Sequence, residues 1–102
     1  MTKYELAQWY GKEMQRFGMS YYNERMNVTE PTEKLMSMTE FSLLSEKDKE
    51  KLLIYGNNMK MFGMGMYAER GACADYYNKC GGRPPRNPFE GEPANESNGY
   101  GM

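Results

Sequence analysis

Residues 10 to 25 read YGKEMQRFGMSYYNER, and residues 55 to 70 read YGNNMKMFGMGMYAER. The two segments match without a gap at an offset of 45, with nine identities in sixteen positions. A chain of this composition would give roughly one or two identities by chance. The match predicts an internal duplication and therefore a fold built from two similar halves. The identical pairs are Tyr10/Tyr55, Gly11/Gly56, Met14/Met59, Phe17/Phe62, Gly18/Gly63, Met19/Met64, Tyr22/Tyr67, Glu24/Glu69 and Arg25/Arg70.

The first segment lies in a predicted helix. Thr2 followed by Glu5 has the form of a capping box, in which each side chain bonds the backbone amide of the other residue. Apolar residues then recur at steps of three and four, and Pro31 blocks continuation. The first helix is therefore predicted over residues 3–27.

The second segment lies in a second predicted helix. Ser45 followed by Asp48 is a weaker capping signal, and an apolar stripe at heptad spacing follows it. Gly81 and its neighbours end this pattern, so the second helix is predicted over residues 46–80. The intervening residues 28–44 mix breakers and apolar groups and are predicted to form a long connection with a short helical turn near its end.

Glycine recurs at heptad spacing in both segments. Two glycines inside a helix cost about 1 kcal/mol each relative to alanine, so their recurrence predicts close approach of another helix. An antiparallel pairing centred on Gly18 opposite Gly63 would use both glycine pairs. The residues predicted to form this helix–helix packing are Gly11, Gly18, Gly56, Gly63, Tyr10, Tyr55, Phe17, Phe62, Met14 and Met59.

The predicted fold class is all-α, with a pseudo-twofold helical hairpin formed by the duplicated segments. The same symmetry also suits a dimer in which the first helix meets its copy, which would give a four-helix bundle. The sequence does not choose between pairing within one chain and pairing between chains. Only about 80 residues remain when the polar tail is set aside, which is marginal for a lone domain, so a homo-oligomer or docking on a partner is expected.

Charged residues complete each segment. In the antiparallel pairing Arg25 falls over Gly56 and Arg70 falls over Gly11, where each guanidinium can lie on a tyrosine ring and meet a carboxylate. The ion-pair or ligand candidates are Glu24, Arg25, Glu69 and Arg70. The alternative is that these four side chains are solvated surface groups that a duplication left unchanged.

The C-terminal stretch differs in composition from the rest of the chain. Residues 81–102 are dominated by glycine, proline, asparagine and glutamate, which predicts an extended or disordered tail after a helical domain of residues 1–80. Such a tail can bind by lying across a partner, and Phe89 is its strongest anchor. The predicted partner-binding residues of the tail are Arg83, Arg86, Phe89 and Tyr100.

The chain contains no histidine, which excludes Ser-His and Cys-His catalysis and imidazole zinc sites. We therefore expect no enzymatic activity, no metal site and no cofactor. Cys73 and Cys80 stand seven apart, too far for a disulfide on one helix, and are interpreted as core thiols.

Methionine is abundant, with 11 residues. Met59, Met61, Met64 and Met66 resemble, weakly, a thioether cluster for Cu(I). We favour the interpretation that they form an adaptable apolar contact surface for another protein, because they lie on or beside the predicted seam.

Charge is nearly balanced, with 13 basic and 14 acidic residues and a net charge of −1. Binding to nucleic acid or an anionic membrane by bulk electrostatics is therefore not expected. No apolar run is long enough to span a membrane, and the first residues lack the apolar stretch of a signal peptide. We expect a soluble intracellular protein or a virion component.

These observations together favour a non-enzymatic protein–protein interaction subunit or structural subunit of a larger assembly. Small size with high methionine and tyrosine content is typical of small phage or virion components, here anchored by the C-terminal tail. The alternative is a phage-type inhibitor or sequestering protein that binds a host enzyme or a nucleotide through arginine and tyrosine. Soft-metal (copper) binding is the third hypothesis.

Overall fold

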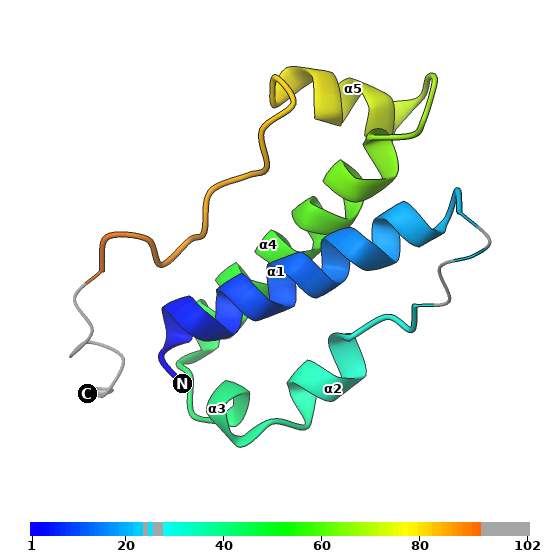
Figure 1. The fold of residues 1–102 in the computed structure, drawn as a ribbon. Helices are drawn as coiled ribbons and strands as arrows, with labels where there is room; N and C mark the ends of the chain where they lie inside the picture. The colour runs from blue at the N-terminus through cyan, green and yellow to red at the C-terminus, as the bar shows by residue number, and fades with distance from the viewer. Residues whose placement is uncertain (24, 26–27, 93–102) are drawn as a thin grey trace.

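The structure of the protein, a computed structural model, describes residues 1–23, 25 and 28–92. In this part of the chain the secondary structure consists of five helices and no strand (Figure 1). The predicted all-α class is confirmed. The helices are α1 (Lys3–Ser20), α2 (Thr32–Met36), α3 (Thr39–Ser42), α4 (Glu46–Gly65) and α5 (Ala72–Lys79).

Both long helices begin at the predicted caps. The Thr2 hydroxyl accepts from the Glu5 amide at 3.1 Å, and the Glu5 carboxylate accepts from the Thr2 amide at 2.9 Å. The Ser45 hydroxyl accepts from the Asp48 amide at 3.1 Å. These bonds satisfy amides that the first helical turn leaves without a partner, so the start of each helix is a local property of the sequence.

The helix ends differ from the prediction. The range 3–27 is too long because α1 ends at Ser20, and the range 46–80 is wrong because α4 ends at Gly65 and α5 is a separate helix. Gly71 precedes α5 with φ of 106°, a conformation that only glycine adopts without strain. The chain reverses there, and α5 packs back on α4 with the Phe62 and Tyr77 rings 5.0 Å apart.

The two long helices pack on each other within one chain, which is one of the two pairings that the sequence left open. Their direction was predicted wrongly, because α1 and α4 run parallel rather than antiparallel (Figure 1). The Lys3 ammonium meets Asp48 at 3.0 Å where both helices begin, and the Gln15 amide lies 3.6 Å from the Met66 sulfur where α4 ends. The connection of residues 21–45, which contains α2 and α3, returns the chain to the starting end.

The glycines determine how closely the helices approach. A Cβ at Gly18 would overlap the Lys60 carbonyl oxygen, and a Cβ at Gly63 would overlap the Gln15 carbonyl oxygen. Gln15 and Lys60 are themselves related by the offset of 45, so the two contacts are equivalent. Backbone meets backbone at this crossing, which only residues without a side chain allow.

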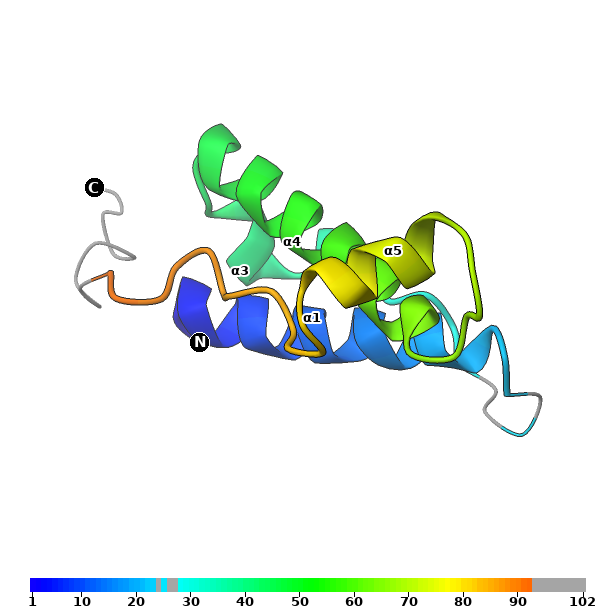
Figure 2. The ribbon, with the colours of Figure 1, turned by 90° about the horizontal axis from the view of Figure 1, so that it is seen from above.

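Farther toward the helix N-termini, side chains separate the backbones. A Cβ at Gly11 would meet the Tyr55 ring, and a Cβ at Gly56 would meet the Tyr10 ring. Figure 2 shows the two helices diverging toward their N-terminal ends. Equivalent residues of the two segments therefore face each other across a wedge that opens from the crossing.

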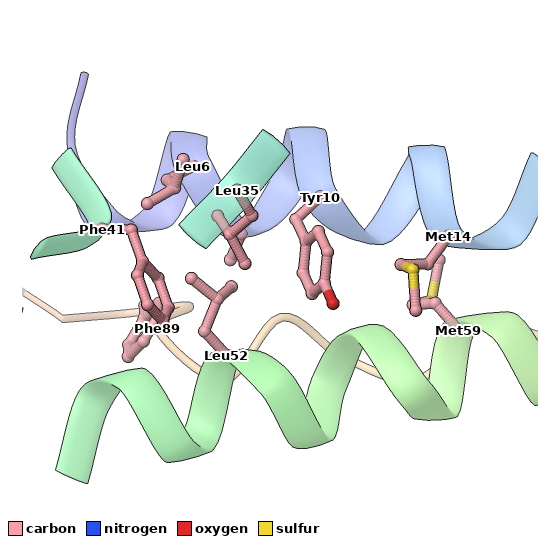
Figure 3. Close-up of a cluster of buried hydrophobic side chains, with 9 residues drawn as sticks. Leu6, Tyr10, Met14, Leu35, Phe41, Leu52, Met59 and Phe89 are labelled. Atoms are coloured by element: carbon pink, nitrogen blue, oxygen red, sulfur yellow. The ribbon is translucent and has the colours of Figure 1, made fainter. Parts of the chain in front are cut away.

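A cluster of buried side chains from α1, α2, α3, α4 and the C-terminal segment fills the wedge (Figure 3). Met14 and Met59 meet near its narrow end, and Leu52 and Phe89 lie near its wide end. The buried members are Leu6, Ala7, Tyr10, Met14, Leu35, Phe41, Leu52, Met59 and Phe89. The connection and the C-terminal segment are thus part of the core.

The C-terminal segment corrects two predictions. Phe89 is only 1% exposed, so it is a core residue and not a free anchor for a partner. After α5 the chain runs back toward the N-terminal end of the helix pair (Figure 1), where the Asn87 amide donates to the Tyr4 carbonyl oxygen at 3.0 Å. The predicted boundary at residue 80 therefore does not hold for residues 81–92, and Tyr100 lies outside the described residues.

Replacing Gly18 with alanine tests the crossing. On an exposed helix face this change would stabilise the protein by about 1 kcal/mol, because alanine is the better helix former. Here we expect a loss of about 2 kcal/mol or more, since the Cβ overlaps a backbone oxygen that cannot move aside. Urea denaturation measures the free energy of unfolding. Gly11→Ala is the matched control and should cost less, because the Tyr55 ring can rotate away.

Replacing Phe89 with alanine tests the contribution of the C-terminal segment. The expected loss is about 3–5 kcal/mol, the usual cost of emptying a buried aromatic site. Arg86→Ala, at an exposed position of the same segment, should change the free energy of unfolding by no more than about 0.5 kcal/mol. Equal effects of the two variants in thermal melts followed by circular dichroism would contradict this assignment.

Candidate protein-binding surface

The charged residues of the two segments do not lie where the sequence placed them. Arg25, Glu69 and Arg70 are exposed and lie in the turns that follow α1 and α4. Arg25 does not cross Gly56, and Arg70 does not cross Gly11, because α1 and α4 run parallel and both helices end before these arginines. Glu24 lies outside the described residues.

The cation–π contacts of the described residues are made by lysines, not by these arginines. The ammonium groups lie over the rings of aromatic residues at distances of 5.0 to 5.7 Å. The pairs are Lys3/Phe89, Lys34/Trp9, Lys49/Phe41 and Lys60/Phe17. The predicted stacking of arginine on Tyr10 or Tyr55 is replaced by packing of each tyrosine ring against a glycine of the opposite helix.

The C-terminal ends of α1 and α4 lie at the same end of the molecule (Figure 1), and we call the exposed residues at these two ends the tyrosine end. It consists of Tyr21, Tyr22, Met66 and Tyr67, with Arg25 and Arg70 beside them. The three tyrosines are each more than half exposed. The helices stop at equivalent positions, since both C-cap residues, Tyr21 and Met66, have φ of −60° and ψ of −28°. The two turns therefore leave the helix pair at the same end, as Figures 1 and 2 show.

Helix packing explains only some of the identities between the two segments. Several of the identical residues are buried between the helices. They are Tyr10, Gly11, Met14, Gly18, Gly56 and Met59. Tyr22 and Tyr67, like Arg25 and Arg70, are identical although they are exposed in the described structure. These identities have no counterpart in the contacts that hold the core together.

The partial charges at the tyrosine end favour positively charged side chains of the protein near the ends of α1 and α4. The carbonyl ends of α1 and α4 carry partial negative charge, and neither last turn contains a basic residue. Arg25 and Arg70 follow directly in the two turns. An arginine fork in this position can hold a carboxylate or phosphate in two hydrogen bonds, while a tyrosine supplies apolar contact and a hydroxyl.

Sequence reasoning identified the arginines of this surface but missed its aromatic residues. Tyr21, Tyr22 and Tyr67 were placed within long helices, because the apolar spacing continues past Ser20 and Gly65. The sequence does contain a signal for these residues. Each segment ends in a tyrosine with an arginine three positions later, Tyr22 with Arg25 and Tyr67 with Arg70. Such a polar–aromatic end is more typical of a turn or a contact surface than of a core helix.

At the opposite end of the molecule, Lys3 joins three parts of the chain. Its ammonium bonds Asp48 of α4 at 3.0 Å and Glu92 of the C-terminal segment at 2.8 Å, and it lies 5.0 Å from the Phe89 ring centre. Desolvation alone would lower the pKa of Lys3, but the hydrogen bonds to Glu92 and Asp48 outweigh it and raise the pKa. This cluster is structural, because it ties the C-terminal segment to both helix starts.

Two of the methionines are used in core packing, while Met66 is exposed at the tyrosine end. Met14 and Met59 are buried, and the Met61 sulfur accepts from the Asn57 amide at 3.9 Å. Cys73 and Cys80 are free, half-buried thiols at the start and the C-cap of α5. Within the described residues no group of three or more cysteine and carboxylate side chains is placed to hold a metal ion.

None of the helices in the described ranges is long and apolar enough to cross a membrane. Comparison of the chain with protein-family models, with curated proteins and with solved structures gives no significant match. The functional argument therefore rests on the residues themselves.

The titrating groups of the core predict loss of stability at alkaline pH. Burial raises the pKa of Tyr10 and of Tyr55 above the ordinary value of 10.0, and the pKa of Lys3 is raised above 10.5. The unfolded chain therefore loses these protons first, so the free energy of unfolding falls as pH rises above about 10. Each group adds a slope of up to roughly 1.4 kcal/mol per pH unit.

Urea denaturation between pH 8 and 11, chosen as about the range that spans these pKa values, measures this slope. Tyr10→Phe should reduce it, because phenylalanine has no proton to lose, although the bond between the Tyr10 hydroxyl and Thr32 at 3.0 Å is also lost. A stability that stays constant through the alkaline range would contradict the assignment.

Proposed function

We propose that this protein is a non-enzymatic interaction subunit of a larger protein assembly and that the tyrosine end is its principal partner-binding surface. The observation that carries the proposal is the repetition of an exposed tyrosine followed at three residues by an exposed arginine. Tyr22 with Arg25 and Tyr67 with Arg70 occur at one end of the helix pair. Core packing does not account for their identity, whereas contact with a partner does.

The composition of the tyrosine end supports binding of a protein. Tyrosine, methionine and arginine are enriched at protein–protein interfaces, and tyrosine and arginine dominate binding hot spots. Tyr21, Tyr22, Met66 and Tyr67 present apolar area that the chain itself leaves uncovered. The arginines select a partner surface that carries carboxylates beside its apolar contact area.

We attribute the two half-sites to an internal duplication of an ancestral helix. Three features support this origin: the match at an offset of 45, the C-caps at equivalent positions, and the reciprocal glycine contacts of α1 and α4. A duplicated helix places two copies of any surface feature around the pseudo-twofold axis. A partner that meets both half-sites gains affinity because the second contact follows the first at high effective concentration.

Small phage or virion components remain the proposed biological setting, on the grounds of size and composition alone. The alternative function, an inhibitor or sequestering protein, uses the same surface. Tyrosine rings can stack on a nucleobase, and Arg25 and Arg70 can contact its phosphates. The two functions differ in their ligand, so one surface can be tested against both.

Site-directed photo-crosslinking tests the proposal. The full chain carries p-benzoylphenylalanine at Tyr22 or at Tyr67 and is expressed in the cells that produce the protein. We expect both positions to cross-link to the same partner. The control position is Gln8, which is exposed on the outer face of α1. Adducts that form equally well at all three positions would count against the tyrosine end.

A Tyr22→Ala/Tyr67→Ala variant measures how much the two tyrosines contribute to the affinity for the partner. If Tyr22 and Tyr67 each behave as hot-spot residues, their joint replacement should weaken partner binding about 100-fold or more. Calorimetric titration of the protein with ATP decides the alternative function. Saturable ATP binding that disappears in an Arg25→Ala/Arg70→Ala variant would replace the protein partner with a nucleotide.

A further inference from the structure

A hollow lies between α4 and the C-terminal segment of residues 81–92, away from the tyrosine end. Its volume is about 250 Å³, which is below the about 300–1,000 Å³ of typical small-molecule sites and leaves room for one or two side chains. One wall belongs to α4 and the other to the C-terminal segment. The lining residues are Lys51, Ile54, Tyr55 and Asn58 of α4, with Pro85, Arg86 and Pro88 of the C-terminal segment.

The walls of the hollow offer apolar contact on both sides. Ile54 is 55% exposed, so the chain itself leaves much of this side chain uncovered. Pro85 and Pro88 are half-buried on the other wall. The Tyr55 ring is held in position because it packs against Gly11 of α1. An apolar side chain that enters the hollow is therefore removed from water by both walls.

The charged residues that line the hollow are both basic. Lys51 has no carboxylate within ion-pair distance among the described residues. Arg86 meets Glu90 at 3.0 Å, and this bond uses one of the five N–H donors of the guanidinium. Glu50, next to Lys51 in the chain, lines a different groove. Two cations and one bonded carboxylate leave the hollow with one positive charge to be matched by a ligand.

Two neutral side chains add hydrogen-bonding groups. The Tyr55 hydroxyl and the Asn58 amide have no hydrogen-bond partner in the described ranges, where every buried polar side-chain atom has one. These two groups therefore reach the solvent. The lining thus presents the donors of four side chains and no carboxylate, which is the composition that suits an anionic ligand.

The backbone of the C-terminal wall favours a peptide as that ligand. In the part of the chain that the structure describes, the stretch from Pro84 to Arg86 makes no backbone–backbone hydrogen bond, so its carbonyl groups are available. The Arg83 amide bonds the C-cap of α5 at 3.2 Å, and the Phe89 ring is buried, so the stretch is held at both ends. A peptide that lies along a stretch already held in place causes little further loss of entropy in the protein.

We propose that this hollow binds a short acidic segment of another protein, in which an apolar side chain lies next to a carboxylate. The apolar side chain enters between Ile54 and the two prolines, and the carboxylate accepts from the Lys51 ammonium and the Arg86 guanidinium. A basic segment would face like charges and is excluded. The inference does not depend on the function proposed for the tyrosine end, because the two surfaces share no residue.

NMR titration of the full chain tests the site. The probe is the peptide acetyl-Asp-Leu-Asp-amide, and its uncharged isostere acetyl-Asn-Leu-Asn-amide is the control ligand. We expect the acidic peptide to bind with a dissociation constant of about 1 mM or lower and to shift the resonances of residues 51–58 and 85–88. The isostere should bind about 10-fold more weakly or less, because it lacks the charge that bonds the two cations.

Variants assign the binding to the lining residues. Lys51→Gln/Arg86→Gln should weaken binding of the acidic peptide about 10-fold or more, and Ile54→Ser should weaken it through lost apolar contact. Lys47→Gln is the matched control, since this exposed lysine lies one turn earlier on α4 and does not line the hollow. It should leave the affinity unchanged. No substituted side chain is fully buried, and circular dichroism should show that all variants remain folded.

The inference is supported if the shifts map to the hollow and only the lining variants weaken them. It is overturned if about 10 mM acidic peptide gives no saturable shifts, if the isostere binds equally well, or if Lys47→Gln has the same effect as the lining variants. Shifts confined to the tyrosine end would overturn it as well. Two further results would replace the peptide with another occupant. Equally tight binding of acetyl-leucine would assign the hollow to a small carboxylic acid, and shifts of the same resonances on dilution of the protein alone would assign it to a second copy.

Discussion

The reciprocal backbone contact between α1 and α4 determines the rest of the structure. Gly18 lies against the Lys60 carbonyl and Gly63 lies against the Gln15 carbonyl. This pair of contacts sets the register of 45 residues and the point of closest approach of the two helices. Side chains larger than hydrogen would separate the helices at the crossing and change the angle at which they diverge.

Because α1 and α4 diverge from that crossing, other elements fill the space between them. Two helices that meet at one end leave a wedge at the other end, and two similar segments cannot fill it by themselves. Leu35 of α2, Phe41 of α3 and Phe89 of the C-terminal segment occupy it. Lys3 then ties the C-terminal segment to both helix starts through Glu92 and Asp48. The irregular parts of the chain are therefore structural.

Local signals predicted the helix starts and the packing partners but not the direction or the ends. Thr2 and Ser45 cap helices through bonds to residues three positions away, so short sequence windows contain the information. Heptad glycines are compatible with either direction, and the choice depends on how the connection returns the chain. The sequence assigns Phe89 to a free tail because the average composition of residues 81–102 is polar. The burial of this one ring depends on elements that are far away in the sequence, which local composition does not reveal.

Burial of Phe89 has a consequence for biosynthesis. The chain is made from the N-terminus, so α1, α2, α3 and α4 all emerge from the ribosome before the ring that completes their shared core. Until residue 89 has emerged, Leu52 and Phe41 lack one of their neighbours. A nascent chain stalled before that point would present an open apolar site, which chaperones and proteases recognise.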